Sequence, residues 1–176
     1  MPDSPATLIP TPRLDGRVSP DVLILMGSKT DLPVAEKAVK VLKEFGITNE
    51  VRVASAHRTP QHVEDLVRNK GAKVFIGIAG VAAALPGVIA SMTTRPVIGV
   101  PVGGKVPYDS LLSIVQMPPG IPVATVGVDR GDNAGFLAAQ MLALQNPELQ
   151  QRIGEQRRRA ADKVLADDAS IQTLEA

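Results

Sequence analysis

The sequence predicts an α/β fold, a three-layer αβα sandwich in which helices cover both faces of a parallel sheet. Short apolar segments alternate with segments of helical periodicity along most of the 176 residues. The apolar segments are continuous rather than alternating, which indicates strands buried on both faces. Connections long enough to hold a helix impose parallel pairing with right-handed crossovers. We therefore expect a flavodoxin-like or Rossmann-like sheet with an extra helix at the C-terminus.

The expected elements follow one another in strict alternation. Gly46 marks the end of the first helix, and Pro60 fits the first turn of the second. The charged segment 148–165 predicts one more helix, beyond the point where the sheet is complete. The predicted strands are 22–26, 50–54, 74–79, 96–100 and 123–126. The predicted helices of the sheet are 32–45, 60–69, 83–92, about 109–115 and about 133–144.

Three regions are expected along the chain. Residues 1–20 are rich in proline, serine and threonine without periodicity and are predicted to be a flexible extension. Residues 21–146 form the α/β domain that carries the chemistry. Residues 147–176 form a helix and tail, which either pack on their own domain or reach another subunit.

Composition excludes several classes of function. The 19 basic and 18 acidic residues nearly cancel, so the net charge gives no case for nucleic-acid binding. Aromatic residues are only 2% of the chain, and no cysteine is available for disulfides or thiolate ligands. No apolar run is long enough to span a bilayer, and the N-terminus lacks the pattern of a signal peptide. We expect a soluble cytoplasmic protein that binds neither nucleic acid nor membranes.

The segment Ser55-Ala56-His57-Arg58 is the predicted centre of the chemistry. It follows the second strand, at the edge where open α/β sheets bind their ligands. Histidine exchanges protons near neutral pH, and arginine grips phosphate or carboxylate. The alternative is a partly buried histidine satisfied by neighbouring backbone. The strand-end position and the adjacent arginine favour acid–base chemistry on an anionic ligand.

Two further loops are candidates for the site. In the turn after the first strand, Ser28 and the following helix start offer hydrogen-bond donors to an anion, and Asp31 could accept from a ribose hydroxyl. Equally, Asp31 or Thr30 could be simply a helix N-cap. The loop 79–87 is rich in glycine and alanine, which permits close approach of a ligand, close helix packing, or both.

Other charged residues give weaker signals. His57 and His62 lack the further ligands that a metal site needs, so no metal is expected. His62 is interpreted as a solvated helix residue. Lys105 could reach a phosphate, although a solvated side chain is the more ordinary interpretation.

Four motifs, taken in order, resemble the PurE family of purine biosynthesis. They are Met26-Gly-Ser-Lys-Thr-Asp31, Ser55-Ala-His-Arg-Thr-Pro60, Ala79-Gly80 with Leu85-Pro86-Gly87, and Ser113-Ile-Val-Gln-Met-Pro118. The resemblance runs from about residue 22 to 144. It implies isomerisation of N5-carboxyaminoimidazole ribonucleotide (N5-CAIR) to 4-carboxyaminoimidazole ribonucleotide (CAIR), without a metal or organic cofactor. It also implies a small-molecule nucleotide substrate and a homo-octamer.

The resemblance implies roles for ten residues. His57 is the catalytic acid–base, and Ser28, Asp31 and Arg58 hold the ribose 5-phosphate end. Small residues around Gly80 form a chamber that retains CO2. The predicted substrate-binding residues are Gly27, Ser28, Asp31, Ser55, Ala56, Arg58, Gly80, Ala82 and Leu85.

The chain departs from the family pattern in two places. Ala84 stands where many members carry a histidine, and the loop 103–108 is shorter than in familiar bacterial members. The alternatives are an aminoimidazole ribonucleotide (AIR) carboxylase that uses CO2, a PurE-like pyridinium nucleotide carboxylase, and a non-catalytic nucleotide-binding module. The segments Leu85–Gly87 and Gln116–Pro118 favour the mutase.

Overall fold

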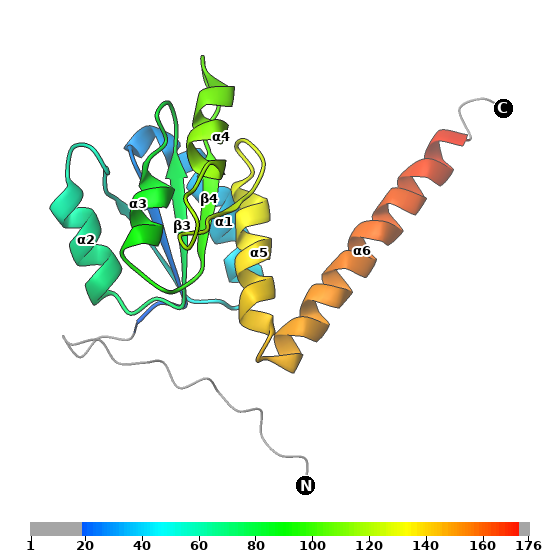
Figure 1. The fold of residues 1–176 in the computed structure, drawn as a ribbon. Helices are drawn as coiled ribbons and strands as arrows, with labels where there is room; N and C mark the ends of the chain where they lie inside the picture. The colour runs from blue at the N-terminus through cyan, green and yellow to red at the C-terminus, as the bar shows by residue number, and fades with distance from the viewer. Residues whose placement is uncertain (1–18, 173–176) are drawn as a thin grey trace, which may run out of the picture.

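The structure, a computed structural model, describes residues 19–172 and contains one five-stranded sheet of order β2-β1-β3-β4-β5. Every neighbouring pair is parallel. The strands are β1 (Val22–Met26), β2 (Asn49–Val53), β3 (Val74–Ala79), β4 (Val97–Pro101) and β5 (Ala124–Thr125). The predicted parallel α/β fold is confirmed (Figure 1).

Six α-helices and one 3-10 turn connect and extend the strands. They are η1 (Lys29–Asp31), α1 (Leu32–Glu44), α2 (Pro60–Asn69), α3 (Leu85–Ser91), α4 (Pro107–Val115), α5 (Gly131–Ala143) and α6 (Pro147–Gln172). Most predicted bounds are correct within two residues. The exception is the end of α6, which continues seven residues beyond the predicted end at 165. Strand β5 is shorter than predicted by one residue at each end.

The side chains of the inner strand β1 divide between two cores. Val22, Ile24 and Met26 pack on the face covered by α1 and α5. Leu23 and Leu25 pack on the opposite face, with buried residues of α2, α3 and α4. All five are buried, as the continuous apolar pattern predicts for a strand between two helical layers.

Two glycines lie where α1 ends and where α1 touches α5. Gly46 adopts a φ of +68° directly after the helix, and its N–H donates to the carbonyl of Lys43, so it ends α1 as predicted. At the start of α5, a Cβ on Gly131 would collide with the carbonyl of Val34 in α1. The two helices therefore touch backbone to backbone on that face of the sheet.

Helix α6 packs on the domain only by its first turns. Leu149 and Ile153 are buried, and the Arg152 guanidinium donates to the carbonyls of Glu44 and Phe45 at 2.8 and 3.0 Å. Every residue from 157 to 171 is exposed, and the helix runs away from the domain (Figure 1). Of the helices described, none is both long and apolar enough to cross a membrane.

The predicted N-terminal extension lies almost wholly outside the described residues. Its last two residues, Ser19 and Pro20, are described and are buried. These two residues therefore pack with the described domain, although the prediction assigns them to the extension.

Candidate functional site

Three loops meet at the carboxyl edge of the sheet because β2, β1 and β3 are neighbours there. They enclose a hollow of about 370 Å³, called the first hollow below. All ten predicted site residues line it: Gly27, Ser28, Asp31, Ser55, Ala56, His57, Arg58, Gly80, Ala82 and Leu85. Thr30, Ala79, Val81 and Ala84 complete the lining. These four lie in the same loops as the predicted residues; three have small apolar side chains, and the Thr30 hydroxyl bonds to Ser28.

Arg58 bridges two of the loops. Its Nη2 donates to the carbonyl of Gly27 at 2.7 Å, and its Nε donates to Ser55 Oγ at 3.3 Å. The same hydroxyl accepts the backbone N–H of Arg58 at 3.2 Å, and the backbone N–H of Ser55 donates to Thr59 Oγ1 at 2.9 Å. These bonds fix the direction of the guanidinium while leaving part of its five N–H groups for an anion.

Asp31 belongs to a capping box at η1. Its carboxylate accepts the backbone N–H of Ser28 at 3.1 Å, and Ser28 Oγ accepts the N–H of Thr30 at 3.3 Å. Burial raises the pKa of Asp31, although the bonds from Ser28 and Thr30 and the charge of Arg58 act in the opposite direction. The N-cap of η1 is therefore Ser28, with Asp31 as the third residue of the capping box, and Asp31 makes no side-chain cap bond as the N-cap of α1. The Asp31 carboxylate also faces the first hollow.

His57 lies in the turn that follows β2, and it is exposed. In the part of the chain that the structure describes, no protein group hydrogen-bonds to its imidazole. The alternative interpretation, a partly buried histidine satisfied by backbone, is therefore wrong. The ring lines the first hollow with both nitrogens available to a ligand.

The third loop forms a wall of small side chains. A Cβ on Gly80 would lie 3.3 Å from Cβ of Val102, and the N–H of Val102 donates to the carbonyl of Ala79 at 2.8 Å. Close packing thus accounts for Gly80, which also lines the first hollow. Val81 has a φ of +57°, a left-handed conformation that is costly for a β-branched residue and that clusters at functional sites.

Lys105 and His62, the two weaker candidates in the sequence, lie outside the first hollow. Lys105 is exposed and does not line the first hollow. His62 is half-buried rather than fully solvated, and it lines a second hollow of about 330 Å³ on the other side of Arg58. Among the described residues, no cluster of three or more histidine, aspartate or glutamate side chains could hold a metal.

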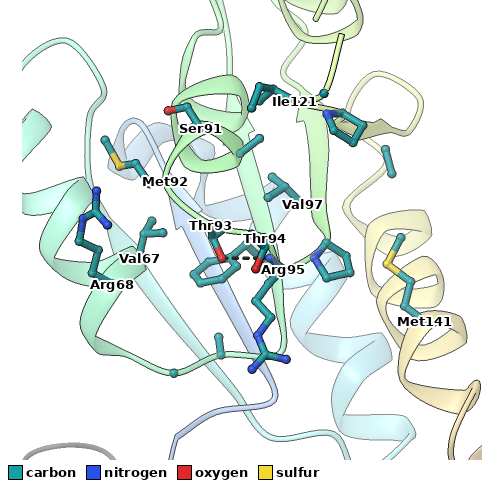
Figure 2. Close-up of a pocket in the computed structure, with 18 residues that line it drawn as sticks. Val67, Arg68, Ser91, Met92, Thr93, Thr94, Arg95, Val97, Ile121 and Met141 are labelled. Atoms are coloured by element: carbon teal, nitrogen blue, oxygen red, sulfur yellow. Dashed lines mark hydrogen bonds between the residues drawn. The ribbon is translucent and has the colours of Figure 1, made fainter. Parts of the chain in front are cut away.

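A larger, open hollow of about 1160 Å³ lies at the opposite, amino edge of the sheet, where β3 and β4 begin (Figure 2). Its lining mixes apolar residues such as Val67 and Val97 with Arg68 and Arg95. It contains no acid and no histidine. Because parallel sheets bind ligands at their carboxyl edge, the smaller first hollow is the candidate site.

Comparisons with known proteins give consistent matches. A family model described as AIR carboxylase matches residues 21–163. The N5-carboxyaminoimidazole ribonucleotide mutase of Methanocaldococcus jannaschii is 57% identical over 154 residues, which are 87% of this chain and 98% of that protein. The protein of the same name from Thermotoga maritima is 48% identical over 160 residues, 88% of this chain and 94% of that protein. The crystal structure of Treponema denticola PurE matches with a TM-score of 0.76 at 32% identity, over 85% of this chain and 96% of that one.

Proposed function

The chain belongs to the AIR carboxylase (PurE) family, and from this premise we propose that it isomerises N5-CAIR to CAIR in de novo purine biosynthesis. The observation that carries the proposal is the convergence of three separate motifs on one hollow, with His57 at its surface. The names of the relatives support the mutase. The carboxylase alternative is not favoured, since these relatives are named as mutases.

His57 performs both proton transfers in this proposal. Its imidazolium protonates the carbamate nitrogen of N5-CAIR. The bond between this nitrogen and the carboxylate carbon then breaks, which gives CO2 and neutral aminoimidazole ribonucleotide. The nucleophilic ring carbon then attacks CO2, and the neutral imidazole removes the proton from that carbon. The imidazole gives one proton to the nitrogen and regains another from the ring carbon, so the enzyme ends in its starting protonation state. Ala84 supplies no second imidazole, and a single one is sufficient for this sequence of steps.

The other residues hold the substrate and the intermediate. Arg58, with its guanidinium already directed by Gly27 and Ser55, binds the 5-phosphate. Asp31 accepts from a ribose hydroxyl while its capping bonds fix the carboxylate. The small residues from Gly80 to Leu85 close on the reacting ring and keep CO2 near the ring carbon, which raises its effective concentration.

The substitution His57→Asn tests the proposal. Turnover should fall by at least about 100-fold, the ordinary contribution of a general acid–base, while substrate binding persists. Steady-state kinetics and calorimetric titration with N5-CAIR would measure the two effects. Unchanged turnover would remove the acid–base role from His57. Loss of binding together with turnover would favour a purely binding role for the ring.

We also propose that the chain acts in the cytoplasm and assembles as a homo-oligomer, an octamer as the resemblance implies. The exposed half of α6 supports an intersubunit arm, because Val164, Leu165 and Ile171 on it are 60–68% exposed. Exposed apolar side chains along a helix that leaves its domain are typical of a surface that another subunit covers.

A further inference from the structure

The second hollow shares a wall with the first. Gly27, Ser28, Ser55 and Arg58 line both, so the guanidinium of Arg58 stands between them. The remaining lining consists of Lys29 from η1, Val53 and Ala54 from the end of β2, and Thr59 and His62 at the start of α2. The second hollow, at about 330 Å³, is nearly as large as the first, which in the proposed function takes a whole nucleotide.

The charged side chains that line the second hollow are all positive. Lys29 and Arg58 are cations, and His62 offers an imidazole N–H in either protonation state. The Thr59 hydroxyl is already engaged, since it donates to the carbonyl of Ser55 at 3.3 Å. None of its lining residues is acidic. In the described part of the chain, no carboxylate pairs with Lys29 or His62. Asp31, in the first hollow, is already bonded to the N–H of Ser28.

We propose that the two hollows together bind a diphosphate group, with one phosphoryl on each side of Arg58. The inference rests on the proposed function in one respect, the assignment of the ribose 5-phosphate to Arg58. The second phosphoryl enters the second hollow and receives hydrogen bonds from Lys29 and His62. The substrate of the proposed reaction is a monophosphate and leaves the second hollow unused. A diphosphate therefore competes with the substrate and inhibits the enzyme.

Two sources could supply a diphosphate, and four probes distinguish them. Calorimetric titration of the full chain with AMP, ADP, inorganic phosphate and pyrophosphate measures the gain from the second phosphoryl in each pair. We expect a gain of about tenfold in affinity, which is the effect of one charge-assisted bond at a partly exposed site. A gain for ADP over AMP assigns a nucleoside diphosphate. A gain only for pyrophosphate over phosphate assigns the free ion.

The variants Lys29→Ala and His62→Gln locate the effect. Together they should abolish the gain, while AMP affinity and turnover of N5-CAIR stay as in the unaltered chain. Lys43→Ala removes an exposed lysine from the far end of α1 and serves as the charge-matched control. Equal affinities for the mono- and diphosphates, or a gain that survives in the double variant, would overturn the inference.

The diphosphate proposal is tested by binding and the proposed reaction by turnover, so one can be contradicted without the other. Turnover of N5-CAIR without any diphosphate gain contradicts the second hollow alone. A diphosphate gain that needs Lys29 and His62, in a chain that does not turn over N5-CAIR, supports the second hollow and contradicts the proposed reaction.

Discussion

At the scale of single residues, Arg58 depends on its neighbours for direction. The Gly27 carbonyl and the Ser55 hydroxyl accept hydrogen bonds from its guanidinium, which thus connects the loops after β1 and β2. Arginine binds phosphate strongly when its planar group is preorganised, because less side-chain freedom is lost on binding. In the proposed function, Arg58 is therefore the main group that binds the 5-phosphate.

Replacing Arg58 by alanine should weaken binding of N5-CAIR by about 10- to 100-fold, the effect of losing charge-assisted hydrogen bonds. Calorimetric titration would measure the dissociation constant. Arg52→Ala is the control, because Arg52 pairs with Glu50 and lines neither hollow. An unaltered dissociation constant for Arg58→Ala would contradict the phosphate assignment.

Asp31 is a buried carboxylate whose pKa is raised by its burial. A raised pKa means that ionisation costs the folded state free energy above that pKa, and that the cost disappears as pH falls below the ordinary value of 3.8. Asparagine keeps an oxygen for the Ser28 N–H without the charge. Asp31→Asn should therefore unfold in urea at pH 7 with equal or greater free energy, by up to about 1 kcal/mol.

The advantage of Asp31→Asn should shrink as pH is lowered toward 4, because the native carboxyl then becomes neutral too. The same variant should bind N5-CAIR more weakly, since the amide replaces a charged acceptor for the ribose hydroxyl. A variant clearly less stable than the unaltered chain at pH 7 would show that the charge is net stabilising, against this account.

At the scale of elements, the contact between α1 and α5 leaves no room for a side chain at Gly131. A Cβ there would collide with the backbone of Val34, so Gly131→Ala must push the two helices apart. We expect a loss of about 3 kcal/mol in the free energy of unfolding, the upper range for overpacking. Chemical denaturation would measure it.

Gly154 gives the matched control in α6, where an added Cβ meets nothing within 4 Å. Gly154→Ala should be neutral or stabilising by up to about 1 kcal/mol, through helix propensity alone. Equal unfolding midpoints for Gly131→Ala and the unaltered chain would contradict the backbone contact.

Apolar periodicity predicts most of these elements because the core strands are buried on both faces. Strand β3 and helix α2 have the predicted bounds, since Gly71, Gly80 and Pro60 punctuate the sequence there. Strand β5 is one residue shorter than predicted at each end, because only Ala124 and Thr125 pair with β4 and the flanking valines extend the apolar pattern beyond the paired residues.

The residues that meet in the first hollow could be predicted from the sequence, but the second hollow and the backbone conformation of Val81 could not. Carboxyl ends of parallel strands share an edge, so Ser28, His57 and Gly80 were expected together, and they line one hollow. The second hollow could not be predicted, because the position of His62 relative to Lys29 depends on how α2 packs beside η1. The left-handed φ of Val81 has no sequence signal either, since a β-branched residue disfavours it.

At the scale of the whole molecule, α6 has two parts with different roles. Leu149 and Ile153 belong to the core, so a truncation after Leu144 would damage the domain itself. Beyond Gln156 the helix continues for about 24 Å, at 1.5 Å per residue, and residues 157–171 are all exposed. This second part is the proposed intersubunit arm.

Deleting residues 157–176 should lower the mass of the assembly in sedimentation, while circular dichroism shows the fold of the domain retained. Val164→Asp with Leu165→Asp in the full chain should act in the same direction by charging the exposed apolar side chains. An assembly that loses only the mass of the deleted residues would contradict the arm.

The most direct test of the whole account follows the carboxylate itself. N5-CAIR labelled with carbon-13 in its carboxylate would be converted in excess unlabelled bicarbonate, and the CAIR analysed by mass spectrometry. We expect the label to be retained, because in the proposed mechanism CO2 stays in the chamber around Gly80 between its release and its recapture. Label diluted to the level of the bicarbonate would contradict the mutase and indicate a carboxylase that draws CO2 from solution.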